Sequence, residues 1–287
     1  MRTMIAKTLF QGPGNNYNVY RGCTHGCIYC DSRSSCYEIP PPFEDIIVKV
    51  NAPELALREL SRKRKKVMVH SGSMCDPYMP IEAELGLSRK VLEVILKTGN
   101  GAGFLTKNVL ALRDLDLMEA IDRQAKAVAC FTLTTMDDAL AKRIEPRASL
   151  PSERLKALWT FAQHGITTGV WMTPLLPFLT ANEENIVSIV RSCAAVQVKY
   201  IVCFDVGTTM REGSRDYFYQ KLDELFPGMK RRYQAEYGLE YICKAPDHER
   251  LYSVFTEECK KAGIAWLWPD IEELTRIPDR IEQLTLF

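Results

Sequence analysis

Cys23-Thr24-His25-Gly26-Cys27-Ile28-Tyr29-Cys30 places three cysteines within eight residues, in the pattern C-x3-C-x2-C. The stretch directly follows a short apolar run at residues 17–21, and its glycine indicates a loop at the end of a strand. A structural zinc ion usually takes four ligands in two close pairs, and a second pair is missing here. Three thiolates at this spacing suit a [4Fe-4S] cluster in which one iron is left open for a substrate. A fortuitous zinc site or a redox loop is the alternative.

The composition indicates a folded, globular protein. With 287 residues, of which 46% are hydrophobic and 25% charged, the chain can build one large core or two small domains. Lysine and arginine number 37 against 36 acidic residues, so the net charge of +1 exerts no overall attraction on nucleic acid or membranes. Either partner would need a local patch.

Two features bear on the cellular compartment. The N-terminal segment 1–10 lacks the apolar core of a signal peptide, and no apolar run reaches the length of a membrane span. These features predict a cytoplasmic protein with no membrane association. In that reducing compartment the ten cysteines are not expected to form disulfides, and a tight cysteine cluster more often binds metal or does redox chemistry.

Short apolar runs alternate with helical patterns over residues 15–226. Helices are predicted to begin near Asn51, Ser88, Ser152 and Asn182. Because strands separated by helices pair in parallel through right-handed crossovers, the pattern predicts an α/β fold, a partial (β/α)6 TIM-type barrel. The six predicted strands are residues 17–21, 67–71, 103–106, 127–134, 167–173 and 200–205.

The alternation weakens beyond Phe226, although residues 247–262 have the pattern of one more amphipathic helix. We therefore expect a barrel core over residues 1–226, which includes the cysteine loop 21–31. A C-terminal extension of helix and strand over residues 227–287 is expected to cap the barrel and to end in a flexible tail.

The cysteine loop resembles the signature of radical S-adenosylmethionine (SAM) enzymes, C-x3-C-x-aromatic-C after the first barrel strand, with Tyr29 in the aromatic position. The resemblance implies that Cys23, Cys27 and Cys30 hold a [4Fe-4S] cluster whose open iron is chelated by SAM. It also implies that the reduced cluster cleaves SAM to methionine and a 5'-deoxyadenosyl radical, which takes a hydrogen atom from the substrate. A flavodoxin or ferredoxin-type protein would supply the electron.

Candidate SAM contacts follow the later strands, since parallel barrels place their chemistry at the carboxyl ends of strands. Gly72 and Ser73 resemble the family's segment for the SAM amino group. Asp76, close by, could bind an ammonium group or only form an Asp-Pro turn. Lys107 ends the third strand and suits the methionyl carboxylate of SAM, and Thr132, in the fourth, can bond the ribose or the carboxylate.

The resemblance extends to the branch that contains spore photoproduct lyase, a DNA-repair enzyme. It rests on residues 20–30, 76–82, 105–107 and 112–117. In that lyase a cysteine beyond the second strand returns a hydrogen atom to the product radical. Cys75 lies in the corresponding segment and is the candidate donor, or else a small buried residue. The lyase carries a tyrosine directly after its last cluster cysteine, whereas this chain has Asp31, so thymine-dimer repair itself is not implied.

Simpler roles are predicted for several other residues. Cys36 falls outside the spacing of the signature, and His25 is expected to shape the loop by hydrogen bonding, since the family's ligands are all cysteine. Arg147 could clamp a ligand or cap a helix. The cysteines that lie among apolar neighbours are predicted to belong to the core: Cys130, Cys193, Cys203, Cys243 and Cys259.

Possible partners are suggested by two basic runs and by the end of the chain. The runs, residues 62–66 and 230–232, could contact phosphate, although the first is expected at a helix C-terminus, where the dipole favours cations anyway. The final segment, Gln283, Leu284, Thr285, Leu286 and Phe287, resembles the peptide with which bacterial repair proteins bind the sliding clamp, but it could instead pack against the barrel.

These observations predict a monomeric, lyase-like radical SAM enzyme that acts on a nucleic-acid lesion. One alternative is the same chemistry on a small molecule or peptide. The other is a non-catalytic metal-binding or DNA-associated protein.

Overall fold

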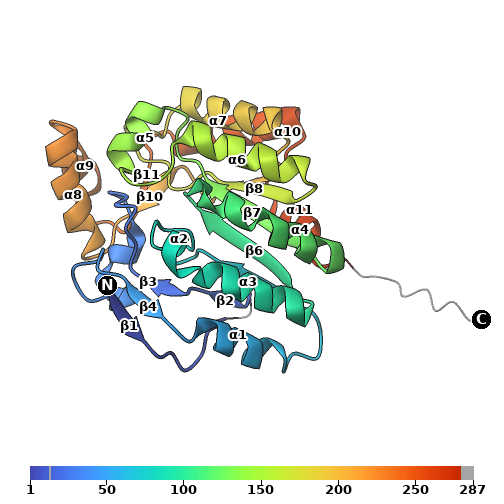
Figure 1. Ribbon diagram of the computed structural model, residues 1–287. Helices are drawn as coiled ribbons and strands as arrows, with labels where there is room; N and C mark the ends of the chain where they lie inside the picture. The colour runs from blue at the N-terminus through green and yellow to red at the C-terminus, as the bar shows by residue number, and fades with distance from the viewer. Residues whose placement is uncertain (13, 279–287) are drawn as a thin grey trace, which may run out of the picture.

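Six parallel strands form the central sheet of the protein, which the computed structural model describes over residues 1–12 and 14–278 (Figure 1). The strand order β2-β5-β6-β7-β8-β9 follows the chain, and every neighbouring pair is parallel. The predicted α/β fold with six parallel strands is therefore confirmed. The strands are β2 (Asn16–Tyr17), β5 (Met68–Ser71), β6 (Gly101–Thr106), β7 (Ala127–Thr132), β8 (Thr167–Trp171) and β9 (Tyr200–Val202).

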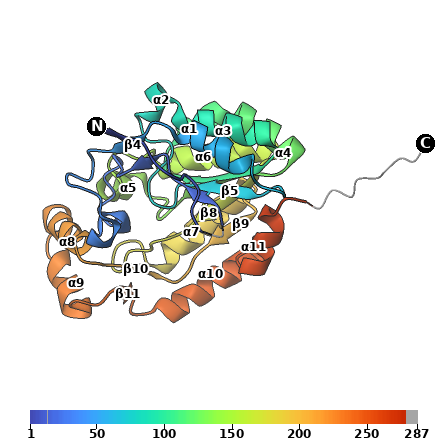
Figure 2. The same cartoon turned by 90° about the horizontal axis from the view of Figure 1, so that it is seen from below.

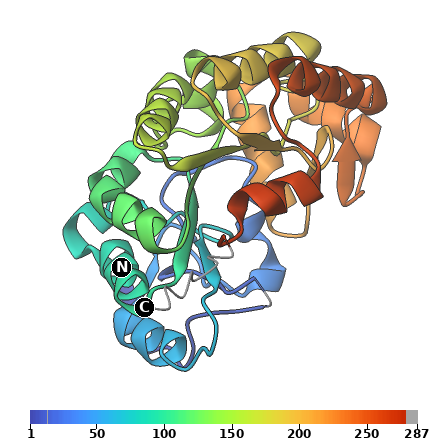
Figure 3. The ribbon, with the colours of Figure 1, turned by 90° about the vertical axis from the view of Figure 1, so that its right-hand side faces the viewer.

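Helices form an arc around the outer side of this sheet (Figure 3). The longer helices bury one apolar face; α3, for example, buries Val91, Leu92 and Ile95. The helices before β9 are α1 (Ala52–Leu60), α2 (Glu82–Leu85), α3 (Leu87–Thr98), α4 (Leu115–Gln124), α5 (Asp138–Ile144), α6 (Pro151–Gln163) and α7 (Glu183–Ala195). Short 3-10 turns are η1 (Asp31–Arg33), η2 (Ser35–Tyr37) and η3 (Val109–Asp114).

The predicted helix starts lie within a residue or two of the observed ones, but only one of two asparagines acts as a cap. The Asn182 side chain accepts from the backbone N–H of Asn185 at 2.9 Å, as a cap should. Asn51 instead exchanges two hydrogen bonds of 2.9 Å with the backbone of Ala6. It therefore ties the N-terminal segment to the start of α1.

The predicted first strand is divided between two sheets. Its beginning is β2, whereas its end is β3 (Tyr20–Arg21), which pairs antiparallel with β4 (Ile47–Lys49). Strand β4 in turn pairs in parallel with β1 (Arg2–Met4). Strands of two or three residues are too short to show a periodicity, so the small sheet was not predicted. It matters for the site because β3 leads directly into the cysteine loop.

The remaining elements follow β9 in the chain (Figure 2). Strand β10 (Gly207–Thr209) pairs antiparallel with β11 (Ile242–Lys244), and the chain between them forms α8 (Ser214–Leu225) and α9 (Met229–Tyr237). The predicted helix at residues 247–262 corresponds to α10 (His248–Ala262), which packs against α7 and is followed by α11 (Trp268–Thr275). Across the described ranges, none of the helices is long and apolar enough to span a membrane.

Candidate active site

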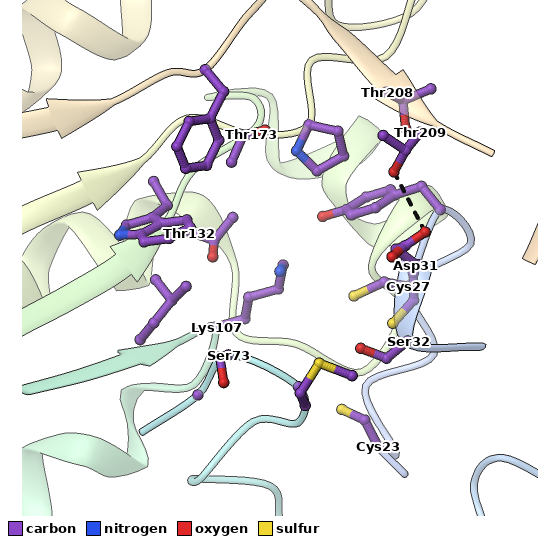
Figure 4. A pocket seen from close by; sticks show the side chains of 18 of the residues that line it. Cys23, Cys27, Asp31, Ser32, Ser73, Lys107, Thr132, Thr173, Thr208 and Thr209 are labelled. Carbon is purple, nitrogen blue, oxygen red and sulfur yellow. Dashed lines mark hydrogen bonds between the residues drawn. The ribbon is translucent and has the colours of Figure 1, made fainter. Parts of the chain in front are cut away.

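A cavity of about 690 Å³ opens at the carboxyl ends of the parallel strands (Figure 4). Its walls come from the cysteine loop, from the segments that follow β5 and β6, and from the end of β7. The sheet thus brings together positions that are far apart in the sequence. Every site residue predicted from the sequence lines this cavity: Cys23, Cys27, Tyr29, Cys30, Gly72, Ser73, Cys75, Lys107 and Thr132.

The three cysteines of the loop suit a group larger than one ion. Within residues 1–12 and 14–278, no three His, Cys, Asp or Glu side chains gather closely enough to hold a single metal ion. Cys23, Cys27 and Cys30 nevertheless line one cavity, as the ligands of an iron–sulfur cluster must. Cys36 is exposed, does not line the cavity and accepts a weak hydrogen bond from Arg211 at 3.6 Å. The donor set therefore fits a [4Fe-4S] cluster with an open iron.

Residues 144–147, at the end of α5 and directly after it, hold the cysteine loop in place. The Ile28 N–H donates to the carbonyl of Ile144 at 2.9 Å, and the Arg147 N–H donates to the carbonyl of His25 at 3.0 Å. The His25 ring is also 3.2 Å from the Arg147 carbonyl. His25 is thus the loop-shaping residue that the sequence predicted. Arg147 supports the loop through its backbone and through a weak bond of 3.5 Å from its guanidinium to the Thr24 carbonyl, a role that neither of its predicted alternatives included.

Asp76 is a buried carboxylate that joins three parts of the site. It accepts hydrogen bonds from the Thr106 hydroxyl at 2.6 Å, the Lys107 N–H at 2.7 Å and the Tyr78 N–H at 2.8 Å. Its other close neighbour is the His25 ring, 3.0 Å away. Burial raises the pKa of Asp76, but His25 and these donors outweigh burial and hold the pKa at about 2. Asp76 was predicted either to bind an ammonium group or to form an Asp-Pro turn. Its oxygens are already engaged by donors of the protein, which favours the structural role over the binding of an ammonium group.

Removal of the Asp76 charge should make the protein less stable and less sensitive to acid. A carboxylate with a pKa of about 2 in the fold and about 3.9 when unfolded stabilises the fold by roughly 2–3 kcal/mol above pH 4. That contribution is lost as the pH falls from about 4 through 2. We expect Asp76→Asn to lower the free energy of unfolding in urea by about 2 kcal/mol at pH 7. Its loss of stability between pH 4 and 2 should also be smaller than that of the wild type, and parallel pH profiles would contradict this role.

The Lys107 side chain, which ends in an ammonium group, lines the cavity (Figure 4). Its Nζ lies 5.8 Å from the centre of the Tyr29 ring, and in the part of the chain that the structure describes it makes no side-chain hydrogen bond or ion pair. Burial lowers the pKa of Lys107, but Cys27 and Glu145 outweigh it and leave the pKa above its usual value. The ammonium is therefore charged and available to an anionic ligand. Thr132, at the end of β7, faces the same space.

Gly72 is required by the packing of the sheet. Its φ is +101°, and a Cβ atom would lie 2.0 Å from the carbonyl oxygen of Leu105. The contact that requires a glycine is with the neighbouring strand β6, and Gly72 also lines the cavity, so its predicted place in the segment for the SAM amino group stays a prediction. Ser73 is exposed, and its hydroxyl accepts a weak bond of 3.5 Å from Asn18.

Cys75 is buried at the edge of the cavity. Its thiol donates to the carbonyl of Tyr20 at 2.9 Å and lies 3.7 Å from the side-chain oxygen of Asn18. Burial raises the pKa of Cys75 to about 12. The residue is therefore a neutral thiol that carries a hydrogen atom next to the cavity.

The outer half of the cavity was not predicted from the sequence. We use this name for the lining residues Trp171, Phe204, Asp205, Thr208, Thr209, Tyr241, Ile242 and Lys244. Phe204 is 65% exposed and packs edge-on against Trp171 with ring centres 5.6 Å apart. Asp205 pairs with Lys244 at 2.7 Å. The ends of the predicted strands could have indicated Trp171 and Phe204, but the β10–β11 pair carries no signal that reveals its position.

Asp31 connects the cysteine loop with this outer half. Its carboxylate accepts from the Tyr37 hydroxyl at 2.8 Å and from the Thr209 hydroxyl at 3.5 Å (Figure 4), and the Arg211 guanidinium lies 3.4 Å away. The residue after the last loop cysteine therefore holds β10 against the loop. A tyrosine at this position could not make the same ionic contact.

Sequence relatives include several uncharacterised proteins. One from Mycobacterium tuberculosis is 27% identical over 226 residues, which cover 77% of this chain and 66% of that protein. One from Methanocaldococcus jannaschii is 32% identical over 171 residues, or 58% of this chain and 63% of that protein. The radical SAM Nalpha-GlyT isomerase of Pseudomonas phage M6 is 24% identical over 162 residues, 56% of this chain and 33% of the phage protein. The chain thus spans less than two thirds of the length of these relatives.

Solved structures of spore photoproduct lyase share the fold. One, in complex with a dinucleoside spore photoproduct, superposes with a TM-score of 0.66 at 15% identity, over 91% of this chain and 80% of that one. A variant with bound AdoMet and the same photoproduct gives 0.67 at 16% identity, over 92% and 82% of the two chains. The Radical SAM superfamily model matches residues 17–224, most of the chain. With its cysteine loop at the mouth of a six-stranded parallel sheet, this chain belongs to the radical SAM superfamily, which implies SAM and a [4Fe-4S] cluster as cofactors.

Proposed function

We propose that this chain is a radical SAM enzyme that acts on a nucleic-acid lesion. The observation that carries the proposal is the aromatic pair Trp171 and Phe204 in the outer half of the cavity that also holds the cysteine loop. Exposed aromatic rings stack on nucleobases, and enzymes that modify a base must take it out of its stack into such a pocket. Lys244 and the hydroxyls of Thr208 and Thr209 add polar groups that could bond a base edge or a phosphate.

The inner half of the cavity would hold the cofactors. We infer that Cys23, Cys27 and Cys30 ligate the cluster, which when bound supplies the electron that cleaves SAM to methionine and a 5'-deoxyadenosyl radical. The Lys107 ammonium would bind the methionyl carboxylate, since it makes no side-chain hydrogen bond or ion pair within the described residues. The Thr132 hydroxyl, the Tyr29 ring and the backbone at residues 72–73 would contact the rest of SAM.

One of the similar proteins supports a nucleic-acid substrate by what the descriptions of its structures say. Spore photoproduct lyase has been solved in complex with a dinucleoside spore photoproduct. Because Asp31 replaces the tyrosine of the lyase signature and holds Arg211, the substrate need not be the same lesion. A lyase-like reaction on another damaged or modified base fits both observations.

Anaerobic turnover with deuterated oligonucleotides tests this function. Reconstituted protein with dithionite and SAM is expected to form 5'-deoxyadenosine faster with lesion-containing DNA than with undamaged DNA, and to carry deuterium into it from the reacting base. Cys75, as the proposed hydrogen donor, adds a second arm: Cys75→Ala should still cleave SAM but should not complete the product, whereas Cys36→Ala should behave as the wild type.

Each alternative function has its own outcome in this assay. Cleavage of SAM that DNA neither stimulates nor consumes would favour a small molecule or peptide as substrate. A colourless protein that holds zinc and cleaves no SAM would favour a non-catalytic metal-binding or DNA-associated role. Unchanged product from Cys75→Ala would remove Cys75 from the mechanism.

Protein partners are also part of the proposal. The sliding-clamp peptide, Gln283, Leu284, Thr285, Leu286 and Phe287, lies outside the described residues. We expect deletion of residues 283–287 to abolish binding to the bacterial sliding clamp in a pull-down, because the apolar anchors of the peptide would be lost. Retained binding would contradict this. A flavodoxin or ferredoxin-type electron donor, a cytoplasmic location and a monomeric state stay predictions.

A further inference from the structure

A buried charge network lies directly behind the cysteine loop. Glu145 and Arg154 form an ion pair in which each side chain is only 1% exposed. The Tyr29 hydroxyl, which belongs to the loop, donates to the same carboxylate. Arg154 also donates to the backbone carbonyl of Thr132 at 2.8 Å. Neither charged residue lines the cavity, so the pair has no direct access to a ligand there.

A buried ion pair of this kind needs an explanation other than stability. Two charges lose much of their hydration free energy on burial, and apolar side chains of similar volume often give an equally stable protein. The proposed SAM site does not use Glu145 or Arg154, since SAM would meet Lys107 and Thr132 instead. The position of the pair beside the cysteine loop is therefore the feature to explain.

The charges are close enough to act on a loop cysteine. The Ile28 N–H, directly after Cys27, donates to the carbonyl of Ile144, directly before Glu145, at 2.9 Å. The Tyr29 ring is 5.8 Å from the Lys107 ammonium, its hydroxyl donates to Glu145, and Cys27 and Lys107 line the same cavity. Burial raises the pKa of Glu145, but Arg154 and Lys107 outweigh it, so the carboxylate is ionised. In a poorly solvated region such charges act over several ångströms.

We propose that Glu145, held in place by Arg154, is a positioning residue that together with Lys107 sets the reduction potential of the cluster through its effect on Cys27. The inference rests on the proposed function, in that Cys27 ligates the cluster. Reduction adds one electron from an external reductant and makes the cluster more negative. A nearby carboxylate opposes that change and an ammonium favours it. Glu145 therefore lowers the potential, and Lys107 raises it.

The test uses two substitutions that should act in opposite directions. Glu145→Gln removes the negative charge but keeps an acceptor for the Tyr29 hydroxyl, and Lys107→Met removes the positive charge from a half-buried side chain. The potential of the reconstituted cluster is measured by EPR during titration with dithionite, without SAM or substrate. At the wild-type midpoint, the ratio of reduced to oxidised cluster should rise about tenfold in Glu145→Gln and fall in Lys107→Met, where tenfold corresponds to about 59 mV for one electron.

The chain offers a closely matched control in Glu82. This carboxylate is also buried, pairs with Arg113 at 2.8 Å and accepts from the Tyr20 hydroxyl, but it does not line the cavity or contact the cysteine loop. Glu82→Gln should therefore leave the reduction potential unchanged, whatever its effect on stability. Iron per chain and thermal unfolding of the iron-free protein, measured for every variant, separate altered potential from altered folding.

Each possible result of the titrations either supports or overturns the inference about Glu145 and Lys107. Potentials that move in opposite directions, with Glu82→Gln unchanged, support the inference. Unchanged potentials, shifts in the same direction, or an equal shift in Glu82→Gln overturn it. If Glu145→Gln takes up no iron, Lys107→Met decides alone, and a potential that does not fall overturns the inference. A wild-type protein that forms no cluster would refute the proposed function, and that result is visible in the iron content before any titration.

Discussion

Cys27→Ala is expected to lose the iron–sulfur cluster and, with it, the cleavage of SAM. Cys27 is buried, lines the cavity and comes from the middle of the cysteine loop, so its replacement removes one of the three thiolates that would hold the cluster. Changes even to residues that support metal ligands typically cost 10–100-fold, so removal of a ligand should lower SAM cleavage by more than about 100-fold. Iron per chain after anaerobic reconstitution and the formation of 5'-deoxyadenosine are the two measurements.

Cys36→Ala is the matched control for this experiment. Cys36 belongs to the segment that follows the loop, but it is exposed and lies outside the cavity. Its replacement should leave iron content and SAM cleavage at the wild-type level. If Cys36→Ala lost the cluster and Cys27→Ala kept it, the ligand set inferred from the C-x3-C-x2-C pattern would be wrong.

The cavity-lining residues at the ends of β5, β6 and β7 could be predicted because a simple rule relates them to the sheet. Parallel strands that follow one another in the chain end at the same edge, so Gly72, Lys107 and Thr132 had to lie near one another once the strands were recognised. The cysteine pattern then placed the loop at that edge. None of this required knowledge of long-range contacts.

The contacts that support the site could not be predicted in the same way. Glu145 meets Tyr29 across 116 positions of sequence, and Thr209 meets Asp31 across 178. No periodicity or spacing marks such pairs, because they depend on how the loops pack after the sheet has formed. The same reason explains why Arg147 was read as a possible ligand clamp, whereas its backbone supports the loop.

Gly72→Ala, a change directly after strand β5, is expected to destabilise the protein strongly. An added Cβ would lie 2.0 Å from the Leu105 oxygen and 2.9 Å from its carbonyl carbon, and both atoms belong to the β6 backbone. Strand β6 cannot move away easily, because it pairs with both β5 and β7. The positive φ costs about 1–2 kcal/mol and the overpacking about 1–3 kcal/mol more, so the free energy of unfolding in urea should fall by roughly 2–5 kcal/mol.

Gly165→Ala separates the two contributions to this loss. Gly165 follows α6, has a φ of +77°, and an added Cβ would meet no atom within 4 Å. It should therefore lose only the conformational part, about 1–2 kcal/mol. The difference between the two variants measures the contact between Gly72 and Leu105. Equal losses would show that β6 yields to the added methyl group.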